Sequence, residues 1–152
     1  MSDTTVPSAA ASEAEALPRW STADVYESFD SRAFVDAMER LRSDADRLVA
    51  RFDDDGIRAV TPRTPTQDDA DATARAIDAY NQAVEHGSTL RATAYAAVAT
   101  NTRDERAQAV MSEIDDINAA VTPLLARLAD WVASLGAEEL AALHPTVADH
   151  AG

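Results

Sequence analysis

Apolar residues recur at helical spacing from residue 31 to residue 54. They follow one another in alternating steps of four and three: Phe34, Met38, Leu41, Ala45, Leu48 and Phe52. This spacing places the side chains on one face of an α-helix, with charged residues on the opposite face. We expect Asp30 or Ser31 to cap the N-terminus of this helix, and Gly56 to end it. The pattern therefore predicts a helix that packs its apolar face into a core.

A second stripe, weaker than the first, runs through residues 67–100. It comprises Ile77, Tyr80 and Val84 and continues through Ser88, Arg91, Tyr95 and Val98. Thr66 precedes the stretch and Asp69 follows three residues later, which matches a capping box with Asp in place of Glu. The stripe weakens near Gly87, and the sequence leaves open whether the helix bends or breaks there. Its Ala-rich faces favour a close approach between helix backbones.

The third and longest stripe occupies residues 103–135. Its members follow steps of three and four: Ala107, Val110, Ile114, Ile117, Val121, Leu124, Leu128, Trp131 and Leu135. Such a seam is typical of a helix that packs against partner helices. Thr102 with Glu105 three residues later predicts the start of the helix, and Gly136 predicts its end. Pro123 lies inside the stretch, where its ring is expected to kink the helix.

One helical domain of residues 19–143 accounts for these patterns. Residues 1–18 are small and polar, with too little apolar surface to offset the entropy of ordering, so we expect a disordered leader. Residues 137–143 predict a short helix stopped by the His-Pro pair that follows, which leaves residues 144–152 as a tail. The predicted fold class is all-α: an antiparallel bundle of three long helices plus short terminal helices.

The composition is strongly acidic, with a formal net charge of −14. All 13 basic residues are Arg, and the chain contains neither Lys nor Cys. Nucleic acid is not an expected partner, because phosphate binding needs a positive surface. A Lys-free acidic surface favours a protein that works in molar salt, where self-repulsion is screened within about 3 Å. No stretch offers the ~20 uncharged apolar residues that span a bilayer, so we expect a cytoplasmic protein without a membrane partner.

Candidate catalytic and metal-binding residues are not found in the sequence. The three histidines, His86, His144 and His150, do not form a His-Glu-x-x-His motif. We interpret His86 as a polar surface residue. The Asp triplet that precedes Gly56 lacks the spaced oxygen ligands of an EF-hand, and we interpret it as a solvated turn. No cofactor is therefore expected in this chain, and a helical bundle built around a metal or cofactor is disfavoured.

Several short elements together resemble the start of oligoendopeptidase F, a thimet-type zinc metallopeptidase. They are Trp20-Ser-Thr-Ala-Asp24-Val-Tyr26, the helix from Phe34 to Phe52, and then Tyr95, Thr102, Asp104, Leu135 and Glu138-Glu139-Leu140, in the family's order. Asn101 departs from the pattern, because an acidic residue is common there. The larger departure is that the family continues to a His-Glu-x-x-His helix and a later Glu, which hold zinc, and this chain contains no such motif.

The resemblance implies a function for the chain as the N-terminal, non-catalytic part of a peptidase that hydrolyses short peptides. Such a part would wall the peptide channel and pack on the catalytic part, which would hold the family's zinc. The alternative is a stand-alone acidic helical interaction module that self-associates with a second copy through the Trp131 seam. Because the third helix is too long for its neighbours to cover evenly, we expect Leu124, Leu128 and Trp131 to be exposed docking residues.

Overall fold

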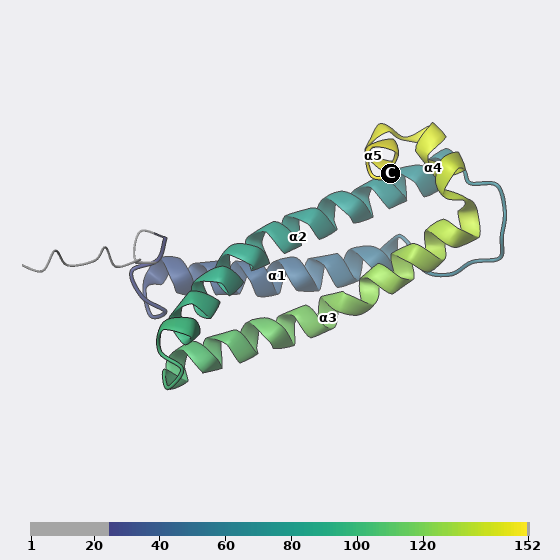
Figure 1. Ribbon diagram of the computed structural model, residues 1–152. Coiled ribbons are helices and arrows are strands. Elements are labelled where there is room, and N and C mark those ends of the chain that lie inside the picture. The colour runs from purple at the N-terminus through teal and green to yellow at the C-terminus, as the bar shows by residue number, and fades with distance from the viewer. Residues whose placement is uncertain (1–24, 152) are drawn as a thin grey trace, which may run out of the picture.

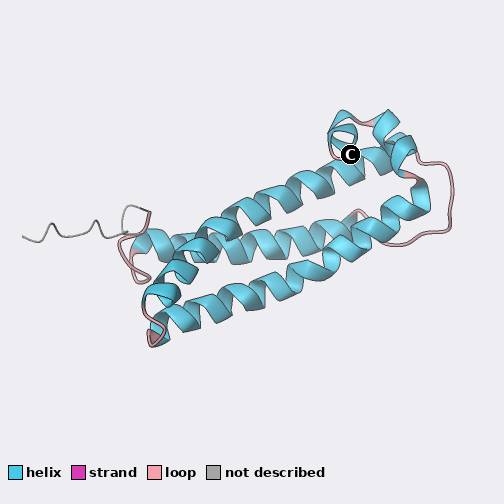
Figure 2. Ribbon diagram, viewed as in Figure 1, coloured by secondary structure: helices cyan, strands magenta, loops and turns pink. Residues whose placement is uncertain are grey.

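The computed structural model describes residues 25–151, and its regular elements are all α-helices (Figures 1 and 2). The elements are α1 (Arg32–Asp54), α2 (Gln67–Thr100), α3 (Glu105–Leu135), α4 (Ala137–Leu143) and α5 (Pro145–Asp149). Helices α1, α2 and α3 lie side by side, successive helices run in opposite directions, and each of the three contacts the other two. The predicted all-α bundle is confirmed. The predicted disordered leader and the Trp20 segment lie outside the described residues.

Both ends of α1 follow local sequence signals. The Ser31 hydroxyl accepts a hydrogen bond from the Phe34 N–H at 3.3 Å, so Ser31 is the N-cap. At the other end the Ile57 N–H donates to the Phe52 carbonyl at 2.9 Å, and the Gly56 N–H donates to the Asp53 carbonyl at 3.2 Å. Gly56 takes a φ of 67°, which this type of helix ending requires of its glycine. Ile57 and Phe52 are fully buried, so the turn also contributes to the core.

The predicted capping box at the start of α2 is confirmed. The Asp69 N–H donates to the Thr66 hydroxyl at 3.3 Å, and the Asp69 carboxylate accepts the Thr66 N–H at 2.7 Å. Arg63 donates two further hydrogen bonds to this carboxylate, at 2.6 and 2.8 Å. Those bonds outweigh the effect of burial and, together with the bonds from Thr66, hold the pKa of Asp69 well below its usual value. Asp69 therefore joins the linker before α2 to its first turn.

The predicted cap of α3 is wrong by two residues. Asp104, and not Thr102, is the N-cap, and its carboxylate accepts a hydrogen bond from the Ala107 N–H at 2.9 Å. The reason is a preceding turn in which the Asp104 N–H donates to the Asn101 carbonyl at 3.0 Å, so that residues 101–104 form the connection instead of helix. From there α3 continues as a single helix through Pro123 to Leu135.

The buried face of α2 differs from the predicted stripe. Small residues and one leucine form it, including Ala76, Ala83, Gly87, Leu90 and Ala94. Tyr95, predicted to lie on the stripe, is 66% exposed. The physical reason is close packing: a Cβ on Gly87 would lie 3.4 Å from Leu41 Cδ1, so α1 and α2 approach closely where the side chains are small. Gly87 does not break the helix.

The predicted tail contains helix α5, which packs on the bundle. Pro145 occupies the first turn of α5. Backbone N–H groups in a first turn have no acceptor within the helix, so the lack of an N–H in proline costs no hydrogen bond there. The Thr146 N–H donates to His144 Nδ1 at 3.1 Å, so His144, which was expected only to stop the preceding helix, also caps α5. Val147 is buried in the core cluster that contains Trp131. Thus α4 and α5 form a helical pair over one end of α2 and α3 (Figure 1).

No helix in the part of the chain that the structure describes is both long and apolar enough to cross a membrane.

We expect molar salt to raise the thermal stability of this bundle. The net charge of −14 repels itself in dilute buffer, and salt both screens that repulsion and strengthens apolar burial. Circular dichroism melts across a salt series would measure the effect. Equal melting temperatures in dilute buffer and in molar salt would contradict it, and with it the interpretation of the acidic composition as an adaptation to salt.

Candidate functional site

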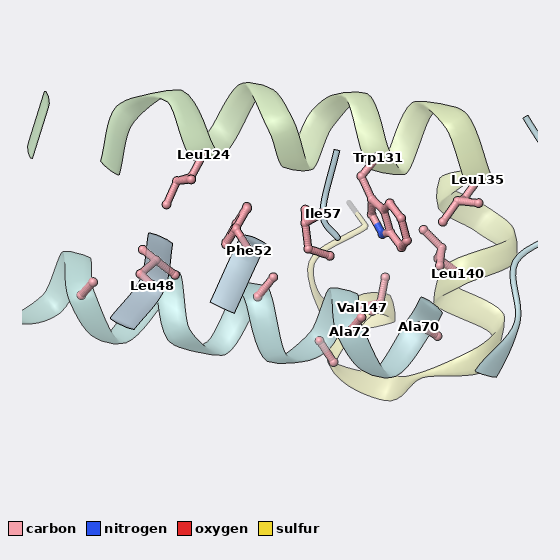
Figure 3. Packing of buried hydrophobic residues seen from close by; sticks show 13 residues of the cluster. Leu48, Phe52, Ile57, Ala70, Ala72, Leu124, Trp131, Leu135, Leu140 and Val147 are labelled. Atoms are coloured by element: carbon pink, nitrogen blue, oxygen red, sulfur yellow. The ribbon is translucent and has the colours of Figure 1, made fainter. Parts of the chain in front are cut away.

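Two of the three predicted docking residues are buried inside the bundle. Leu124 is 3% exposed and Trp131 is 4% exposed, so the prediction that they lie on the surface is wrong. Trp131 points from α3 toward α2 and lies beside Leu135 and Leu140 (Figure 3). Its Nε1 donates a hydrogen bond to Thr73 Oγ1 at 2.9 Å. The physical reason is that other helices cover both side chains: Leu124 faces Leu48 and Phe52 of α1 (Figure 3), and Trp131 packs with Leu140 of α4 and Val147 of α5.

The apolar surface that does reach solvent lies beside Leu128, the third predicted residue. Leu128 is half-buried, and Leu125, which was not predicted, is 47% exposed. Both line a cavity of about 430 Å³ between α2, α3 and the α4–α5 pair. Further apolar walls come from Ile77 and Tyr80 on α2 and from Val147 on α5. We call this cavity the α2–α3 groove.

One edge of the α2–α3 groove is polar. Asn81 on α2 and His150 after α5 meet there, with Asn81 Nδ2 and His150 Nε2 3.2 Å apart. His150 Nδ1 lies 2.9 Å from the Thr146 carbonyl oxygen. Because a carbonyl only accepts, Nδ1 must carry the proton and Nε2 must accept from Asn81. Both ring nitrogens of His150 are therefore engaged in fixing α5 against α2.

The groove is lined mainly by apolar side chains, and its buried polar residue, Thr73, forms its hydrogen bonds within the protein. Thr73 is the deepest polar member, and its hydroxyl donates to the Asp69 carbonyl at 2.7 Å while accepting from Trp131. Its hydrogen-bonding capacity is thus used within the protein. A groove of this kind favours apolar side chains of a partner and offers no activated nucleophile for catalysis.

Three residues that line the groove have an exposed acidic residue next to them in the sequence. Asp78, Glu138 and Asp149 are all exposed, and each is the sequence neighbour of a lining residue: Ile77, Ala137 and His150 respectively. Among the described residues, no arginine lines the groove. Arg75 on α2 and Arg127 on α3 instead donate to Asp55 and Asp53 at the end of α1, at 2.9 and 2.7 Å. These two arginines are therefore paired with acids at the end of α1.

A second cluster joins α1 and α2 through Asp44 and His86. His86 Nδ1 lies 2.7 Å from Asp44 Oδ2, and Arg47 pairs with the other carboxylate oxygen. Burial raises the pKa of Asp44, but the hydrogen bonds from His86 and Arg47 outweigh it and leave the pKa below its usual value. His86 is exposed, as predicted, but its partner was missed. The available signal was Asp44 itself, a carboxylate three residues after Leu41, on the buried face of α1.

The Asp44–His86 cluster has the geometry of a structural tie. Within residues 25–151, no group of three or more His, Asp or Glu side chains is arranged to hold a metal ion. The cluster therefore connects two helices, and the α2–α3 groove is the stronger candidate for binding.

Comparison with known proteins gives no match to a family model, to a curated protein or to a solved structure. A function for this chain must therefore be argued from its own residues.

Proposed function

We propose that this chain is a non-catalytic helical region of an oligoendopeptidase F-like zinc peptidase and that it packs on the catalytic part. The observation that carries the proposal is the α2–α3 groove, a partly exposed apolar surface on an otherwise acidic bundle. Concave, mostly apolar clefts with a few polar groups are where proteins bind ligands and partners. The resemblance supplies the identity of the partner, and the order of the helices is consistent with it.

The bundle is long enough to form one wall of a peptide channel. At 1.5 Å per residue, the 34 residues of α2 extend for about 50 Å, and α1 and α3 lie along it. A rigid helical layer of that length could border a channel and admit only short, unfolded peptides. The zinc and the base that activates its water would come from the catalytic part, since this chain contains no His-Glu-x-x-His motif.

Self-association of a stand-alone module remains the alternative, but it cannot use the predicted contact through Trp131. Trp131 offers almost no exposed surface to a second copy, because it is buried against Thr73 on α2. A dimer formed through this part of α3 would use Leu125 and Leu128 instead. Light scattering of the purified chain would detect it.

The DNA that follows the codon for Gly152 tests the proposed function most directly. A continuation in frame, or in a shifted frame, that encodes His-Glu-x-x-His would support a peptidase. Unrelated downstream sequence, combined with the absence of such a peptidase gene elsewhere in the genome, would overturn it.

We expect the purified chain to have no peptidase activity of its own. Incubated with zinc and a quenched-fluorescent oligopeptide, it should give no turnover above a blank, because the sequence contains no His-Glu-x-x-His motif to bind zinc and activate water. Cleavage that a chelator abolishes, and that copurifies with the chain through two chromatographic steps, would contradict this prediction.

A further inference from the structure

We draw no further inference here: the strongest candidate, the apolar α2–α3 groove beside the α4–α5 pair, carries nothing beyond the proposed function, because nothing in the structure shows what covers it.

Discussion

Replacing Trp131 with Ala should lower the free energy of unfolding by about 3–5 kcal/mol, the largest effect that we expect from a single substitution. The indole is 4% exposed and packs in the cluster that joins α2, α3, α4 and α5. Its removal would leave a cavity that the surrounding helices fill only in part. For a chain of this length the corresponding fall in melting temperature is about 10 °C. Denaturant unfolding followed by circular dichroism would measure it.

Two further substitutions separate packing from hydrogen bonding at the same place. Thr73→Val keeps the volume but removes the acceptor of the Trp131 N–H, which would leave a buried donor unpaired at a cost of about 1–3 kcal/mol. Thr73→Ser retains the hydroxyl and should cost less. Leu125→Ala, on the same helix but half-exposed, is the control for a general effect on α3. If Trp131→Ala costs no more than Leu125→Ala, Trp131 is not a core residue.

The predictions for α1 succeeded because its signals are local and its apolar residues are large. The spacing of Phe34, Met38 and Leu48 places all three on one face of the helix, and that face is buried. Ser31 and Gly56 act on the backbone within a few residues of themselves. Each of these features depends on neighbouring residues in the sequence, so the sequence alone is enough to find them.

The buried face of α2 could not be found in the same way. Alanines lie around much of this helix, and an Ala is compatible with either a buried or an exposed position. The spacing of the larger residues pointed to Val84 and Tyr95, which are exposed, yet the face that packs is the one on which Ala83 and Gly87 allow close approach to α1. Which face of α2 packs depends on its contact with α1, where Leu41 lies next to Gly87, and the sequence of α2 does not show this contact.

The candidate site was predicted in part. The spacing on α3 correctly placed Leu124 and Trp131 on an apolar face, and Leu128 does line the groove. Part of the cover around Trp131 comes from Val147 of α5, a helix of five residues that is too short to show a periodic pattern. Its docking through Val147 is a tertiary contact, as is the pairing of Asp44 with His86, which lie 42 residues apart. The local sequence can mark one member of such a contact, as Asp44 on the buried face of α1 does, but it does not identify the partner.

Replacing Asp69 with Ala should cost about 2 kcal/mol at neutral pH, because it removes half of the capping box at the start of α2 and leaves Arg63 without its acceptor. The carboxylate is buried and accepts hydrogen bonds from Arg63 and Thr66, which hold its pKa below the ordinary value. The wild-type chain therefore holds this stabilisation in full above the pKa of an unfolded Asp, about 4, and loses it as the pH falls through that value toward the lower folded pKa.

Asp69→Ala and Asp69→Asn should both flatten this acid dependence. Asp71→Ala removes an acid one half-turn away, whose carboxylate accepts a hydrogen bond from Gln67, and is the matched control. Urea unfolding of the three variants and the wild type between neutral and acidic pH would measure the differences, and an unchanged acid slope in Asp69→Asn would show that this carboxylate does not stabilise the fold.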